Sequence, residues 1–171
     1  HKGKTVFRAT CCGEEGHSAL APRYVKAIHV AGELVQSLQQ VQQQICRFGA
    51  QDLGYDIPYT TVHVGKIAGG TALNIVPNQC VVDYEIRNLA QDRSQHIQDK
   101  ILEQIDVDFR RHIDLQQLNQ YPGLKTSSTI EAVQFIQTLL PQETSIGNIS
   151  FGTEGGFFQG ALNCPVVVRG P

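Results

Sequence analysis

The chain has 171 residues, of which 41% are hydrophobic and 18% are charged, and its formal net charge at pH 7 is −2. This composition is typical of a globular protein that is large enough to bury its own core. A protein that neutralises phosphates needs clustered Lys and Arg, so the slight negative charge argues against a nucleic-acid partner. No apolar run approaches the ~20 residues of a membrane-spanning helix, so we expect no membrane partner.

The five cysteines are odd in number and widely scattered, and they contain no C-x-x-C pair. This pattern is not that of a disulfide framework or a zinc knuckle. We therefore predict buried free thiols and a reducing, cytoplasmic location. The chain begins at His1 without a methionine and stops just after an apolar stretch, so we expect it to be an excerpt of a longer polypeptide.

The first half of the chain reads as strand, helix, strand. Residues 5–11 alternate apolar and polar positions, as a strand with one covered face does. After Pro22 and Arg23, apolar side chains recur at three- and four-residue steps as far as Ile45, which predicts a long amphipathic helix. Five glutamines on its other faces are interpreted as a solvated helix surface. Residues 59–67 are rich in β-branched and aromatic side chains and predict a second strand.

A glycine-rich turn at residues 69–77 (GGTALNIVP) separates this strand from the next one. Residues 82–87 alternate apolar and charged positions, which is the clearest strand pattern in the chain. Asp92 and Gln95 have the spacing of a capping box, and an apolar stripe continues from there to Phe109. These signals predict a third strand followed by a second helix.

A weaker strand around residues 115–118 completes the order βαββαβ. This order predicts an α+β fold of the ferredoxin-like kind, a four-stranded antiparallel sheet with two helices on one face. We assign this first domain to residues 1–120.

Residues 121–171 differ in character and are predicted to be a fragment of an α/β domain. Ser128 and Glu131 suit a capping box at the start of a short helix. Residues 149–151 and 166–168 are nearly all apolar, as strands buried on both faces of a parallel sheet are. One helix and two short strands cannot form such a sheet, so this segment needs a partner from outside the chain.

Three side chains in the first domain are candidates for a functional site. His17 lies in a G-H-S-A loop, either as an exposed loop residue or as an N–H donor to a developing oxyanion. Asn74 lies in the glycine-rich turn, where its carboxamide can bond its own backbone or a substrate. Arg87 ends the alternating strand, and it fits either a surface ion pair or a carboxylate-binding fork.

A further candidate is the stretch FGTEGG at residues 151–156. It joins an apolar segment to a predicted helix start, where backbone N–H groups can receive an anion. Glu154 stands alone there, and we assign it no role as a general base or a metal ligand. A dinuclear metal site needs several converging Asp, Glu and His ligands, which this chain does not supply.

Taken in order, these stretches resemble the metallo-amidohydrolase and aminopeptidase family that includes acetylornithine deacetylase and succinyl-diaminopimelate desuccinylase. The resemblance covers nearly the whole chain and favours the deacetylase branch. It implies a two-domain enzyme, of which this chain is the lid and dimerisation domain with part of the catalytic domain. Its main segments are residues 1–3 (HKG), 16–19 (GHSA), 58–62 (PYTTV), 69–77, 85–87 (EIR), 122–124 (PGL) and 151–157.

The resemblance implies hydrolysis of the acetyl amide of N-acetylornithine, or of another small N-acyl amino acid. It implies two zinc or cobalt ions whose ligands lie outside this chain, so we expect the chain alone to be inactive. It also implies a homodimer through the lid domain, in which His17 crosses to the partner as the oxyanion donor. The residues implied to bind the substrate are Asn74, Arg87, Gly152 and Thr153.

Two other interpretations stay open. The parent protein is either a related hydrolase, acting on succinyl-diaminopimelate, acetylcitrulline or a dipeptide, or a non-catalytic dimeric amino-acid-binding module. The lid motifs do not separate the hydrolases, because selectivity depends on pocket residues from both domains. Residues 23–26 and Asn163 depart from the family pattern, and these departures weaken the assignment to a branch more than the assignment to the family.

Overall fold

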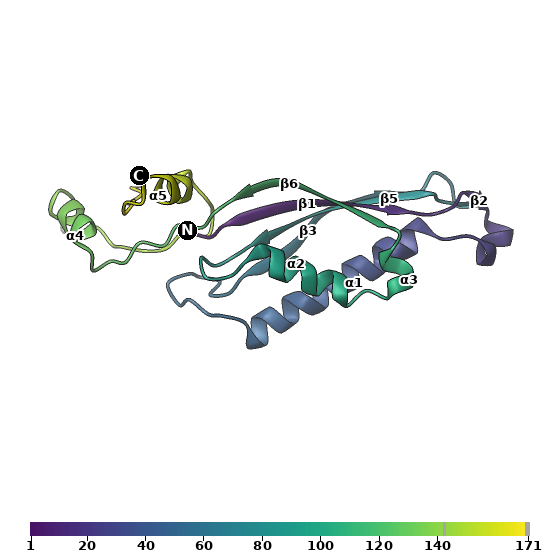
Figure 1. Cartoon of the computed structure of the whole chain (residues 1–171), viewed down its shortest axis with the longest axis horizontal. Coiled ribbons are helices and arrows are strands. Elements are labelled where there is room, and N and C mark those ends of the chain that lie inside the picture. The colour runs from purple at the N-terminus through teal and green to yellow at the C-terminus, as the bar shows by residue number, and fades with distance from the viewer. Residues whose placement is uncertain (142, 170–171) are drawn as a thin grey trace.

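The computed structural model describes residues 1–141 and 143–169, and its main feature is one antiparallel sheet (Figure 1). Four strands pair in the order β3-β5-β1-β6. They are β1 (Lys4–Cys12), β3 (Thr61–Gly69), β5 (Gln79–Arg87) and β6 (Ile113–Tyr121). This is the strand order of the split βαβ fold, so the predicted α+β architecture is confirmed.

Two helices cover one face of the sheet, α1 (Ala27–Phe48) and α2 (Ser94–Glu103) (Figure 1). The glutamine-rich side of α1 is exposed, as predicted. The helices bury the alternate apolar side chains of β1 and β5, because successive residues of a strand point to opposite faces. The core that results consists of Phe7, Ala9, Cys11, Ala27, Val30, Ala31, Leu34, Leu38, Val41, Cys80, Val82, Tyr84, Ile86, Ile97, Ile101 and Ile105.

The opposite face of the sheet is polar. Nε and Nη2 of Arg8 donate to the two carboxylate oxygens of Asp83, both at 2.8 Å. Glu85 and Arg87 follow Asp83 along the same face of β5. The sheet therefore has one apolar and one charged side, which is the pattern that the alternation in β5 predicted.

The second helical region differs from the prediction. No side chain caps α2, which begins after Arg93, so the predicted capping box of Asp92 and Gln95 is wrong. Asp92 instead accepts a hydrogen bond from the hydroxyl of Thr60. The apolar stripe that was predicted to continue to Phe109 is divided between two helices, α2 and the short helix α3 (Val107–Arg110). Asp106 caps the start of α3, because its side chain accepts a hydrogen bond from the N–H of Asp108.

The segment after β6 contains two helices, α4 (Glu131–Thr138) and α5 (Gly155–Leu162). The N-cap of α4 is Ile130 without a side-chain hydrogen bond, so the capping box of Ser128 and Glu131 is also wrong. Residues 149–151 and 166–168 form no strand in the described part of the chain. A strand requires a neighbour for its backbone groups, and the described residues of this segment provide none.

Two of the five cysteines, Cys11 and Cys80, are buried opposite each other on β1 and β5. The prediction of buried thiols is wrong for Cys12, Cys46 and Cys164, which are exposed. Among the described residues, no helix combines the length and the apolar character needed to cross a bilayer.

Candidate functional site

His17 and Asn74 lie together beyond one end of the main sheet. There β2 (Gly16–His17), which is labelled in Figure 1, pairs with β4 (Ile75–Val76), and His17 is opposite Ile75. The N–H of Ser18 donates to the carbonyl of Asn74 at 2.9 Å. Gly70 allows the turn between β3 and β4, because its φ of +89° lies in the left-handed region that favours glycine.

The ring of His17 is held by its own chain. Its Nδ1 accepts a hydrogen bond from the N–H of Ala19 at 3.2 Å, at the start of a 3₁₀ helix (Ser18–Arg23). A neutral imidazole that accepts at Nδ1 carries its proton on Nε2. The side chain is exposed, so Nε2 is a donor directed away from the bond that orients the ring.

Asn74 is exposed and its carboxamide makes no hydrogen bond to any residue that the structure describes. The alternative in which the side chain bonds its own turn is therefore not observed. The backbone closes the turn instead, through an N–H of Ile75 that donates to the carbonyl of Ala72 at 3.2 Å. Both groups of the carboxamide are free for a ligand or a partner.

Arg87 lies at the other end of the sheet, in an ion pair and a hydrogen bond. Its Nε donates to Oε1 of Glu85 at 2.8 Å, and its Nη1 donates to the hydroxyl of Tyr121 at 2.6 Å. The surface ion pair considered from the sequence is thus present. Across residues 1–141 and 143–169 nothing pairs with Nη2, so one edge of the guanidinium is available to a carboxylate.

Gly152 and Thr153, in the segment after the sheet, lie at the same end of the sheet as Arg87 and Tyr121. A Cβ on Gly152 would overlap Cε2 of Tyr121, so glycine permits this close contact. The N–H of Thr153 donates to Nε2 of His1 at 3.3 Å. The hydroxyl of Thr153 accepts from the N–H of Gly155 at 3.1 Å, which fixes the loop at the start of α5.

The five candidate residues therefore form two groups at opposite ends of one sheet. Tyr121 pairs with Lys4 at the first residue of β1, whereas Gln79 pairs with Cys12 at the last. A strand of nine residues is about 30 Å long at 3.3 Å a residue. A single chain does not bring His17 and Asn74 to Arg87.

Two residues near Arg87 were not predicted from the sequence. Neither Tyr121 nor His1 was assigned a role in the site from the sequence. Tyr121 contacts both Arg87 and Gly152, and His1 contacts both Tyr121 and Thr153. The available signal was the position of Tyr121 directly before Pro122 and Gly123, where the sheet ends and the next segment begins.

The residues do not fit a metal centre. In the part of the chain that the structure describes, no three His, Cys, Asp or Glu side chains lie close enough to hold an ion. Glu85, the nearest carboxylate to Arg87, is paired with that residue and lies 3.8 Å from Nζ of Lys4. This group carries two cations and one anion, which suits an anionic ligand.

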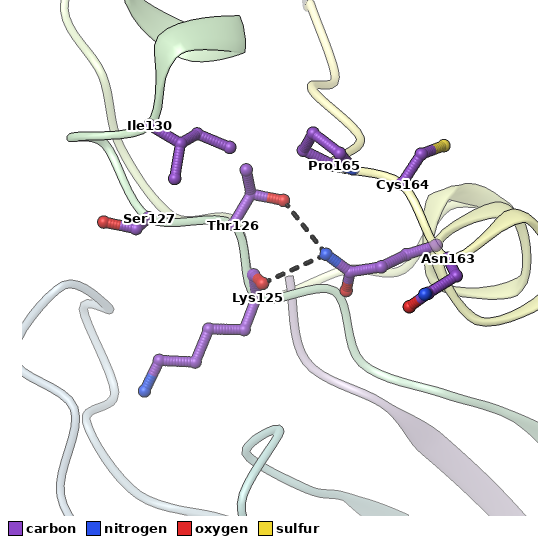
Figure 2. Close-up of a pocket in the computed structure, with 8 residues that line it drawn as sticks. Lys125, Thr126, Ser127, Ile130, Asn163, Cys164 and Pro165 are labelled. Carbon is purple, nitrogen blue, oxygen red and sulfur yellow. Dashed lines mark hydrogen bonds between the residues drawn. The ribbon is translucent and has the colours of Figure 1, made fainter.

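A separate cavity of about 400 Å³ lies between α5 and the chain preceding α4 (Figure 2). Gln159 crosses it, because its Nε2 donates to the carbonyl of Lys125 at 3.2 Å and to Oγ1 of Thr126 at 3.4 Å. None of the five candidate residues lines this cavity. The candidate site is therefore the pair of groups at the ends of the sheet.

Comparison with known sequences identifies relatives along the whole chain. A family model for the peptidase dimerisation domain matches residues 1–113. Acetylornithine deacetylases of Pasteurella multocida (strain Pm70) and Myxococcus xanthus are 27% and 30% identical over all of this chain, which covers 44% and 45% of their lengths. The chain thus spans less than half the length of these curated relatives.

Solved structures share the fold at lower identity. Aminopeptidase PepT from Bacillus cereus ATCC 10987 has a TM-score of 0.71 at 21% identity, over 93% of this chain and 41% of that one. A tripeptidase from Staphylococcus aureus has a TM-score of 0.66 at 20% identity, over 96% of this chain and 42% of that one. Because the family model covers well over half of the residues, the chain belongs to the M20 peptidase dimerisation-domain family.

Proposed function

We propose that this chain is the dimerisation and substrate-binding part of an enzyme that hydrolyses N-acetylornithine to ornithine and acetate. Support comes from the likeness of the whole chain to acetylornithine deacetylases. The observation that carries the proposal is the separation of the candidate residues into two groups, an exposed one with His17 and Asn74 and a partly exposed one with Arg87, Gly152 and Thr153. Each group is half of a site, and a second copy of the chain can supply the other half.

The proposal assigns the metal to the rest of the enzyme. M20 enzymes are metal-dependent, and the residues of this chain that the structure describes do not fit a metal centre. The zinc or cobalt ions are therefore assigned to residues outside this chain, and residues 121–171 to the domain that holds them. This chain by itself is expected to release no acetate.

Each candidate residue has a role that its contacts allow. The proton on Nε2 of His17 can be donated to the oxygen that becomes negative during amide hydrolysis. Asn74 offers both a donor and an acceptor to the amide of the substrate. Arg87 offers its free edge to the carboxylate, and the Gly152–Thr153 loop contacts Tyr121, which accepts a hydrogen bond from Arg87.

Dimerisation through β3 would join the two halves of the site. β3 is an edge strand with a largely exposed outer side, and edge strands pair readily with a second copy. Its first residue, Thr61, is opposite Arg87 in the sheet, and its last residue, Gly69, leads into the turn that carries Asn74.

Antiparallel pairing of two β3 strands about a two-fold axis reverses their directions. The end of β3 at Gly69 in one protomer would then lie beside the end at Thr61 in its partner. This brings His17 and Asn74 of one protomer toward Arg87 of the other. Each dimer would contain two sites, each built from both chains.

Mixing two inactive variants of the full-length protein tests this arrangement. His17→Ala and Arg87→Ala are each expected to lower turnover of N-acetylornithine, His17→Ala by roughly 10²–10³-fold, as for the loss of an oxyanion donor. After the variants are unfolded and refolded together, half of the dimers are mixed, and one site in each mixed dimer has both native residues. Activity should return to about a quarter of the wild-type level.

Two controls make the result decisive. Refolding either variant alone should restore nothing, and analytical ultracentrifugation should show a dimer in every sample. An active wild-type monomer, or mixed variants that stay inactive, would contradict the shared site. Wild-type protein loaded with zinc or cobalt that cleaves N-succinyl-diaminopimelate instead of N-acetylornithine would contradict the substrate.

A further inference from the structure

The free edge of Arg87 depends on how the rest of its guanidinium is held. Glu85 accepts from Nε at 2.8 Å and Tyr121 accepts from Nη1 at 2.6 Å. The side chain of Arg87 is 26% exposed, so the group is partly shielded from water while Nη2 stays free. Hydrogen bonds that involve an ionised group are short and strong, so the two partners limit the rotation of the guanidinium.

Tyr121 contacts the Gly152–Thr153 loop with its ring. The positions of Cε2, Cζ and Oη of Tyr121 around Gly152 leave no room for a Cβ there, because a Cβ would overlap all three atoms. The ring of His1 lies edge-on to Tyr121, with centroids 6.4 Å apart and an interplanar angle of 77°. Tyr121 therefore lies between Arg87 and the loop and contacts both.

His1 connects the same loop to the sheet. Its Nδ1 lies 2.9 Å from the carbonyl of Lys2, and its Nε2 accepts from the N–H of Thr153. A neutral imidazole satisfies both bonds if Nδ1 carries the proton. The loop is thus held on one side by His1 and on the other by Tyr121.

We infer that Tyr121 is a positioning residue for carboxylate binding. Its hydroxyl orients Arg87, and its ring keeps the Gly152–Thr153 loop at a fixed distance from that guanidinium. The inference rests on the proposed function, because it takes Arg87 and the loop as the carboxylate-binding groups. It assigns to Tyr121 no contact with the reacting amide.

The test is Tyr121→Phe in the full-length protein, which removes the hydroxyl and keeps the ring against Gly152. The KM for N-acetylornithine should rise roughly tenfold, as for the loss of one hydrogen bond to a charged group, while kcat stays within about twofold. The KM for N-acetylornithine amide, in which the carboxylate is a neutral carboxamide, should be the same in both proteins. In the Arg87→Ala background, Tyr121→Phe should have almost no further effect.

Tyr55→Phe is the matched control, because this tyrosine is buried beside Lys2 and makes no hydrogen bond to Arg87 among the described residues. It should leave both KM values unchanged. A rise in KM of equal size for the acid and the amide would show a merely structural role and overturn the inference. An unchanged KM for the acid would overturn it as well.

Binding separates this inference from the proposed function. Calorimetric titration of N-acetylornithine into metal-stripped protein should give a Kd that Tyr121→Phe raises roughly tenfold. Wild-type protein that binds the acid but hydrolyses nothing would contradict the proposed function while the inference stands if Tyr121→Phe weakens binding. Binding that Tyr121→Phe does not weaken would overturn the inference even where turnover is normal.

Discussion

The sheet domain and the segment after it use their apolar residues in opposite ways. All sixteen residues of the core cluster belong to the first 105 residues of the chain. In the later segment, Phe135, Phe151 and Leu162 are 61%, 67% and 66% exposed. Leu124 and Val133 are its only buried large apolar side chains among the residues described. The first region is stabilised by its own core, whereas the second is held mainly by contacts near Tyr121.

This difference indicates that the exposed apolar surface of the later segment binds a partner. Large exposed apolar patches are uncommon on monomeric proteins and usually mark an interaction site. The apolar side chains of the later segment fit the proposal that it is part of a further domain.

The largest contrast should be in thiol reactivity. Burial raises the pKa of Cys11 to about 12, so its thiolate is scarce at neutral pH. Cys164 in the later segment is exposed. We expect iodoacetamide to label Cys164 on the order of 10³-fold faster than Cys11 in the native chain, because Cys11 requires unfolding to react. Mass spectrometry of the labelled peptides measures both rates.

Cys80 provides an internal check on this contrast. It lies opposite Cys11 in the same core, and burial raises its pKa as well. It should therefore be protected to a similar degree. In a denaturant that unfolds the chain, the labelling rates of Cys11, Cys80 and Cys164 should become similar. Rapid labelling of Cys11 without denaturant would contradict the structure of this core.

The same leucine substitution should have different effects in the two regions. Leu34→Ala opens a cavity in the core, where the side chain is 0% exposed, and should lower the free energy of unfolding by about 2–5 kcal/mol. Leu162→Ala changes an exposed position in α5 and should cost less than about 0.5 kcal/mol. Urea unfolding of the two variants gives both values. Equal costs would mean that α5 belongs to the same cooperative core.

Lys2 stabilises the sheet domain by a polar contact. It is 1% exposed, and its Nζ donates to the carbonyls of Ile57 and Tyr59 at 2.8 and 2.6 Å. Lys2→Met keeps the length of the side chain but leaves both carbonyls unpaired. We expect a loss of about 2 kcal/mol in the free energy of unfolding.

Lys100→Met is the control, because Lys100 is exposed in the last turn of α2. It should change the free energy of unfolding by less than about 0.5 kcal/mol. If Lys2→Met were equally mild, the loop of residues 49–60 would not depend on this lysine for its position.

Those features of the fold that depend on one covered face could be predicted from the sequence. The alternation in β5 and the apolar stripe of α1 each arise because one face of the element is buried against the core. The spacing of apolar residues in the sequence is therefore enough to identify both elements. The capping boxes failed because spacing alone does not decide which group a side chain meets. Asp92 bonds Thr60, which lies 32 residues earlier in the chain.

The candidate site shows the same limit. His17, Asn74 and Arg87 lie in motifs that sequence analysis selects, but their separation into two groups depends on strand direction and register. Tyr121 belongs to no motif, and its importance comes from contacts with residues 34 and 31 positions away, Arg87 and Gly152. The two predicted strands after residue 121 failed because pairing requires backbone groups that the described residues do not offer.

The smallest change in the free energy of unfolding is expected for a substitution on the polar face of the sheet. The Arg8 guanidinium bonds both oxygens of Asp83 and lowers the pKa of that carboxyl below its usual 3.8. Exposed ion pairs contribute little, because water and salt screen them. Asp83→Asn should therefore destabilise the chain less than Lys2→Met does, and the loss should shrink further in high salt.

The pH dependence of this loss has a definite sign. Between the lowered pKa and 3.8, the unfolded chain binds more protons than the folded one, so stability rises with pH in that interval. The stability that the pair contributes is complete above about pH 5 and disappears as the pH falls through the lowered pKa. Wild type and Asp83→Asn should thus differ most at neutral pH and converge in acid. A difference that persisted in acid would mean that Asp83 acts through packing, and the polar face would then resemble the core more than the later segment.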